Sequence, residues 1–87
     1  MATEEKVGVV TDYYAKIGVA AITLADGALR VGDRIRIHGH TTDLTQTVES
    51  LHVEHRPVQT AERGSEVALK VRDRVRKHDA VLRVTGD

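Results

Sequence analysis

Histidine is the residue type in this chain that could most readily bind a metal ion, because neutral imidazole is a common ligand. Five histidines occur among 87 residues. His38 and His40 would lie on one face of a strand, since strand side chains alternate between two faces. His52 and His55 are three positions apart and would face opposite ways. The spacing therefore encodes no local three-ligand site, and we predict neither a metal nor another cofactor.

Nucleophilic and phosphate-transfer chemistry also lack a recognisable motif. The chain has no cysteine, and neither Ser50 nor Ser65 lies in a sequence typical of an activated nucleophile. No Gly-x-x-x-x-Gly-Lys-Ser/Thr segment occurs, so the phosphate-binding loop of a nucleotide site is absent. We therefore predict that the protein is not an enzyme, has no catalytic residue and binds no nucleotide.

Basic side chains are the group that favours a ligand, and this ligand would be an anion. Arg34 and Arg36 share a face of one predicted strand. Further along, a second set contains five basic residues: Lys70, Arg72, Arg74, Arg76 and Lys77. Guanidinium groups make bidentate contacts to phosphate, so both sets are candidate RNA-binding or partner-binding residues. The alternative is an ordinary solvated face, and the net charge of zero provides no overall basic field.

The composition limits the kind of protein that holds these residues. With 40% hydrophobic and 30% charged side chains, the chain can bury one modest core. We expect a single domain over residues 6–84, a frayed N-terminal tail over 1–5 and a C-terminal tail over 85–87. No apolar run approaches the ~20 residues of a membrane span, and the first residues lack the pattern of a signal peptide. A cytoplasmic protein without membrane contact is therefore expected.

The segment 29–39 predicts the type of secondary structure. Leu29 and Val31 alternate with polar or small residues before Gly32-Asp33, and two isoleucines alternate with basic residues after it. This pattern is typical of a strand, a tight turn and a second strand. Glycine tolerates a positive φ, and aspartate bonds to backbone close to itself in sequence. We therefore expect Gly32 in a turn that would strain another residue, and Asp33 accepting a hydrogen bond from a nearby backbone N–H.

The segment 44–55 is the longest strand candidate, and its hydrophobic residues change face. Val48 belongs to one alternation, whereas Leu51 and Val53 belong to the other. A β-bulge near Glu49-Ser50 would account for this change. Pro57 is expected to end the strand because proline cannot donate to a ladder, and a helical turn is expected over residues 59–62.

The whole pattern predicts six or seven short strands joined by turns that contain Gly and Asp. The other strand candidates lie near residues 7–12, 19–24, 66–72 and 80–84. Strands of this length in so small a chain predict an all-β protein, a closed or nearly closed antiparallel β-barrel of six to seven strands. A two-sheet sandwich is the structural alternative.

Six segments in a fixed order carry a family resemblance, and they cover nearly the whole chain: Lys6–Val10, Lys16–Ala20, Gly27–Ile37, Thr47–Val53, Ala61–Leu69 and Arg76–Leu82. The series resembles the second domain of the translational GTPases, the β-barrel that follows the G domain in elongation factor Tu. More narrowly, it resembles small stand-alone proteins described as translation-elongation-factor-like. The chain departs from that family at Gly64-Ser65 and at His78-Asp79, where Gly-Asp is usual.

The resemblance implies a barrel of the translation-factor domain 2 type without the nucleotide switch. In elongation factor Tu this barrel meets the acceptor end of aminoacyl-tRNA near the end of the long bulged strand. By position, the resemblance makes His52, Glu54, His55 and Arg56 candidate partner-binding residues. The leading hypothesis is therefore a non-enzymatic module that binds RNA, including tRNA, or the ribosome and other parts of the translation machinery.

A protein–protein interaction module is the alternative hypothesis. The same barrel also occurs as an appended domain in larger enzymes, including some collagenase-like peptidases. In that case the chain would dock to a partner enzyme or associate with itself. Salt-sensitive RNA binding would favour the first hypothesis, and a stoichiometric complex without RNA would favour the second.

Overall fold

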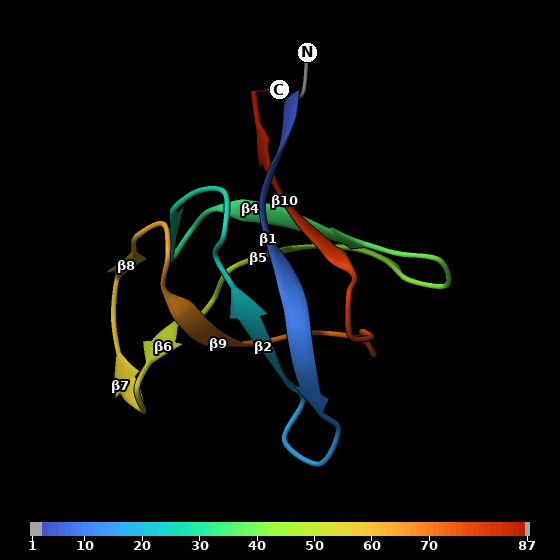
Figure 1. Cartoon of the computed structure of the whole chain (residues 1–87), viewed down its shortest axis with the longest axis horizontal. Coiled ribbons are helices and arrows are strands. Elements are labelled where there is room, and N and C mark those ends of the chain that lie inside the picture. The colour runs from blue at the N-terminus through green and yellow to red at the C-terminus, as the bar shows by residue number, and fades with distance from the viewer. Residues whose placement is uncertain (1–2, 87) are drawn as a thin grey trace.

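A computed structural model describes residues 3–86, and every regular element in this range is a β-strand (Figure 1). The expected all-β class is therefore confirmed. There are ten strands in the described range instead of six or seven, because short connections pair as two-residue strands. The bounds are β1 Thr3–Tyr14, β2 Val19–Thr23, β3 Leu29–Arg30, β4 Arg34–His38, β5 Asp43–Thr47, β6 His52–Val53, β7 Arg56–Pro57, β8 Thr60–Ala61, β9 Glu66–Lys70 and β10 Ala80–Thr85.

Eight of these strands form one antiparallel sheet, in the order β5-β4-β10-β1-β2-β9-β6-β7. β3 and β8 form a separate antiparallel pair. Within residues 3–86 no ladder joins β5 to β7, so backbone pairing leaves the sheet open. Figure 1 shows β1 and β10 crossing the centre of the molecule, with the start of β1 beside the end of β10. No helix in the described range is long and apolar enough to cross a membrane.

Both ends of the chain are paired further out than the expected domain limits. Thr3, Glu4 and Glu5 pair with β10, where Thr85 is the partner of Thr3. The outer parts of the expected tails, residues 1–2 and 87, lie outside the described range.

The expected bulge near Glu49-Ser50 is wrong, because the chain leaves the sheet between Thr47 and His52. Val48 N–H donates to the Asp33 carbonyl at 2.8 Å and Val48 C=O accepts from Gly32 N–H at 2.9 Å. The segment is thus tied to the turn before β4, and Val48 is buried without needing a strand register. The register shifts lie in β1 instead, between Lys6 and Gly8 and between Val10 and Asp12.

The turn before β4 has the expected geometry. Gly32 has a φ of 97°, in the region that favours glycine. Asp33 Oδ2 accepts a hydrogen bond from the Arg30 N–H at 2.9 Å. His78 has a φ of 75° just before β10, so this histidine adopts the left-handed conformation where the family named above usually has glycine.

Two expectations around Pro57 are wrong. Pro57 does not end the strand over 44–55, because β6 ends at Val53 in a turn and Pro57 lies in the following edge strand β7, paired with His52. The expected helical turn over residues 59–62 is the second. Thr60–Ala61 is β8, which pairs with β3 and buries Ala61 in the core.

The core is filled by aliphatic side chains from the inward faces of the strands. Its largest fully buried members are Ile22, Leu24, Leu29, Ile35, Ile37, Leu51 and Leu69. On β2 and β9 the buried positions alternate with positions open to solvent, as a sheet with one packed face requires. The residues that alternate with the core therefore form an outer face on β2 and β9.

Gln46 is a buried polar residue that connects two distant parts of the sheet. Its Nε2 donates to the Lys70 carbonyl at 2.8 Å, and its Oε1 accepts from the Arg72 N–H at 2.8 Å. The side-chain amide has the donor and acceptor of a peptide group, so it pairs with the backbone as a neighbouring strand would. Through Gln46, β5 contacts the chain at the end of β9.

Candidate functional site

A groove lies on the outer face of the sheet, across β2, β9 and β6. Its floor is formed by two alanines, because Ala21 on β2 is the register partner of Ala68 on β9, and Ala68 is also paired with His52 on β6. Short side chains on neighbouring strands leave a depression between taller residues. The larger hollow there has a volume of about 560 Å³ and adjoins a second of about 370 Å³. These volumes lie in the range of ligand sites.

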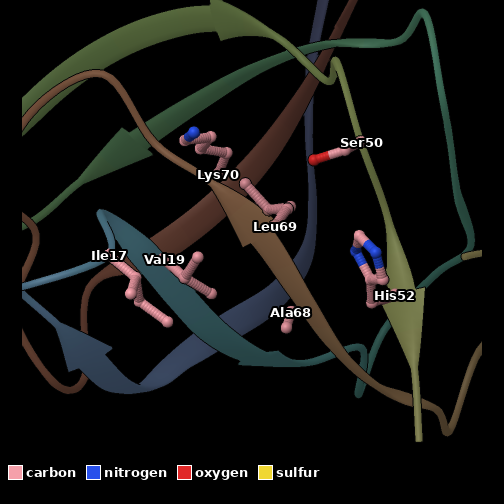
Figure 2. Close-up of a pocket in the computed structure, with 7 residues that line it drawn as sticks. All are labelled: Ile17, Val19, Ser50, His52, Ala68, Leu69 and Lys70. Atoms are coloured by element: carbon pink, nitrogen blue, oxygen red, sulfur yellow. The ribbon is translucent and has the colours of Figure 1, made fainter. Parts of the chain in front are cut away.

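Apolar side chains from the end of β1, the following turn and β2 line one side of the groove. Among the large hydrophobic side chains of residues 3–86, Tyr14 and Ile17 are exposed, at 48% and 63%. Figure 2 shows Ile17 and Val19 on one side of Ala68 and His52 on the other. The same four residues line both hollows, so the hollows form one continuous groove.

The far side of the groove is built by a tight β6–β7 hairpin. Its two loop residues, Glu54 and His55, have φ values of 51° and 65°. Two successive positive φ values match the type I′ turn, which twists the strands correctly but prefers Asn-Gly. A glutamate and a histidine therefore occupy a strained turn at the edge of the groove, and such strain is typical of functional sites.

Charge is distributed unequally along the groove. Glu54 and Glu66 line the larger hollow, and neither forms an ion pair with any residue in the described range. Lys70 lies on the same strand face as Glu66 and lines the adjoining hollow with Ser50 (Figure 2). The groove is therefore acidic at one end and basic at the other.

Four of the candidate residues named from the sequence come together here. His52, Glu54, His55 and Lys70 all line the groove. Arg56 is exposed on β7, directly after the hairpin turn. As expected for residues three apart, His52 and His55 do not share a strand face, since the turn separates them.

The β4 arginines lie elsewhere, and one of them is already bound to acids. Arg36 Nε and Nη2 donate to the two Asp43 oxygens at 2.8 and 3.0 Å, and Arg36 Nη1 donates to Glu4 at 3.2 Å. These hydrogen bonds raise the pKa of Arg36 and lower the pKa of Asp43. Arg34 is exposed on the same strand. The guanidinium of Arg36 is therefore committed to an internal ion pair.

The remaining basic candidates lie after β9, in the connection to β10. Arg72 Nη2 lies 3.3 Å from Glu49 Oε1, and both side chains are exposed. Arg74 and Arg76 border a polar hollow with the residues 41–44, and Lys77 is exposed beside them. The stretch 70–77 is thus split, because only Lys70 faces the groove. Whether any of these residues contacts a ligand stays a prediction.

The main groove residues that sequence reasoning missed are Tyr14, Ile17, Val19, Ala21, Glu66 and Ala68. One signal was present, because an isoleucine in an expected turn has no core position to fill. The alanines carried no signal, since alanine occurs on either face of a strand. In the described part of the chain, no three His, Asp or Glu side chains group in a way that could hold a metal ion.

Comparison with known proteins identifies relatives among peptidases. The chain is 35% identical over 85 residues to a collagenase of Porphyromonas gingivalis, a match of 94% of this chain and 20% of that protein. It is 36% identical over 77 residues to an uncharacterized protease of Methanocaldococcus jannaschii, with 87% and 19% covered. The chain thus spans about a fifth of the length of these relatives. No protein-family model matches it.

A solved structure shares the fold. The C-terminal domain of a Geobacillus thermoleovorans protein named as a U32 peptidase superposes with a TM-score of 0.84. Sequence identity is 22%, and 91% of each chain is covered. This likeness extends over nearly the whole of both chains.

These relatives correct the family resemblance and the function drawn from it. The similarity is to collagenase and protease sequences and to a U32 peptidase domain, so the assignment to the elongation factor Tu type is wrong. With it falls the hypothesis of an RNA-binding translation module. The physical reason is that Gly32 and Asp33 satisfy the geometry of a turn, which any small β-fold with that turn requires. The chain is similar over nearly all its length to part of these peptidases, and its fold is that of a U32 peptidase C-terminal domain.

Proposed function

We propose that this chain is a non-catalytic accessory domain that holds extended polypeptide for a peptidase. One observation carries the proposal: 94% of the chain matches only a fifth of a protein named collagenase. The likeness to a C-terminal peptidase domain supports an appended position. In this proposal the remaining length of such a protein performs the hydrolysis, and the small β-domain contributes binding of the substrate.

We propose unfolded collagen chains as the first substrate class to test, because one relative is named a collagenase. Heat-denatured collagen, or gelatin, exposes extended backbone and apolar side chains. Extended Pro-rich segments are commonly recognised in grooves lined by aromatic side chains. The groove over β2, β9 and β6 is lined by the aromatic side chain of Tyr14 and by Ile17, both exposed.

The test uses the purified 87-residue chain and fluorescently labelled gelatin. We expect saturable binding by fluorescence anisotropy, weaker binding of native triple-helical collagen, and no new peptide amino termini after prolonged incubation. Folded serum albumin is the control for non-specific adsorption. Absence of gelatin binding at millimolar protein would overturn the binding role, and release of peptides would overturn the non-catalytic role.

We also propose that this domain is a nearly closed β-barrel. Support comes from Gln46, whose amide bridges β5 to the backbone after β9. Gln46 is only 4% exposed, so both hydrogen bonds lie in a poorly solvated place where they are costly to lose. A barrel held in this way would keep β2, β9 and β6 in fixed positions around the groove.

A further inference from the structure

The groove over β2, β9 and β6 has the dimensions of a strand-binding surface. Glu66, Ala68 and Lys70 follow one another on the outer face of β9, because every second residue of a strand faces the same way. The acid and the base are four positions apart, which places their backbone positions about 13 Å apart. An extended peptide rises by the same distance per residue, so a segment of about five residues spans the two charges.

The middle of the groove favours small or apolar ligand side chains. Ala21 and Ala68 keep the floor low, and Val19 borders it. Tyr14 and Ile17 stand at one side as exposed apolar surface that a ligand would cover. Removing such surface from water is favourable in proportion to its area.

The ends of the groove determine the charge of the ligand. Glu54 and Glu66 border the larger hollow without an ion pair in residues 3–86, and no lysine or arginine lines that hollow. Two carboxylates repel a phosphate and attract an ammonium or guanidinium group. At the other end, Lys70 is likewise without an ion pair in the described range.

We propose that this groove binds an extended polypeptide segment that carries a lysine or arginine at the Glu54 and Glu66 end and an aspartate or glutamate at the Lys70 end. The inference rests on the proposed function, because it names the site and the ligand class for polypeptide binding. A second copy of this chain is the other occupant that the groove could take, and the experiment separates it.

The test is fluorescence anisotropy with labelled, capped five-residue peptides. The matched probe is Lys-Ala-Val-Ala-Glu, and the mismatched probe has glutamate in place of lysine. We expect the wild-type chain to bind the matched probe, with affinity decreasing as salt is added because exposed charges are screened. The mismatched probe should bind about fivefold more weakly, because it loses an exposed ion pair and adds a repulsion between carboxylates.

Two groove variants and one control locate the binding. Glu66→Lys should weaken the matched probe about fivefold, since it reverses one of the attracting charges. Ala68→Leu should weaken both this probe and gelatin about tenfold, because it raises the floor where a small side chain must fit. Glu62→Lys makes the same charge change at an exposed position outside the groove and should leave affinity unchanged. Circular dichroism and urea unfolding establish that each variant is folded.

Each outcome has a defined meaning. If gelatin binds but Ala68→Leu and Glu66→Lys leave both affinities unchanged, the groove is not the site, and the proposed accessory role stands without it. If neither gelatin nor the matched probe binds, both proposals fall. If sedimentation shows a dimer that Ala68→Leu dissociates, the groove is occupied by a second copy and the peptide assignment is overturned.

Discussion

Gly32 has a backbone conformation that other residue types rarely adopt. Gly32 has a φ of 97°, and a Cβ added there would meet no atom within 4 Å. Space is therefore not the reason for glycine at this position. The reason is backbone geometry, since a residue with a Cβ rarely adopts such a φ.

Replacing Gly32 by Val should destabilise the fold by about 1 to 3 kcal/mol, the cost of a branched residue at positive φ. Urea unfolding followed by circular dichroism measures this change. Gly32→Asn is the matched variant and should cost less, because asparagine tolerates the left-handed region better than valine. Equal stability of the valine variant and the wild type would show that the turn relaxes to ordinary β geometry.

The β6–β7 hairpin is the element whose local sequence disagrees most with its shape. Both loop residues have positive φ, and neither is Gly, Asn or Asp. Glu54 and His55 also line the groove, so the positions that cost stability are those that border the proposed binding surface. Such an exchange of stability for function is expected at binding sites.

Replacing Glu54 by Asn and His55 by Gly together should therefore stabilise the chain by about 1 kcal/mol, because Asn-Gly suits a type I′ turn. The same double variant should bind the matched lysine peptide more weakly, since the Glu54 carboxylate is removed. Thermal unfolding and peptide anisotropy on one preparation measure both effects. A variant that is less stable than wild type would contradict the assigned turn.

At the scale of the whole molecule, the edge strand β5 is tied to the chain at the end of β9 by a side chain instead of a ladder. β5 and the end of β9 are linked through both polar atoms of Gln46. A leucine of similar size would leave the Lys70 carbonyl and the Arg72 N–H without this partner. Each polar group left unpaired in a poorly solvated site costs about 1 to 3 kcal/mol.

We therefore expect Gln46→Leu to destabilise the chain by about 2 to 4 kcal/mol. Thr45→Ala, at an exposed position on the same strand, is the control and should change stability by less than about 0.5 kcal/mol. Hydrogen exchange of the Arg72 amide should accelerate in the leucine variant only. If that amide stays protected and stability is unchanged, other contacts hold β5 to the chain after β9.

The sequence by itself determined the strand class and the local turn geometry. Alternation of apolar residues predicted the strands, and Gly32-Asp33 predicted a turn with positive φ and a backbone hydrogen bond to aspartate. Interactions between residues close in sequence determine these features, so a local sequence pattern is enough to predict them. The order of such segments led to the wrong family, because different proteins with small β-folds need the same turns.

Only the tertiary structure decided where the long segment 44–55 leaves the sheet and where the groove lies. Val48 is removed from strand pairing by hydrogen bonds to the turn at Gly32 and Asp33, which no local pattern reveals. Ala21 and Ala68 form one floor because β2 and β9 are neighbours, although the two alanines are 47 positions apart in the sequence. The ion pairs of Arg36 also depend on tertiary structure. The sequence made Arg36 a candidate for binding phosphate, whereas the fold places its guanidinium between Glu4 and Asp43. Non-local contacts set these features, and a one-dimensional pattern does not specify which strands become neighbours.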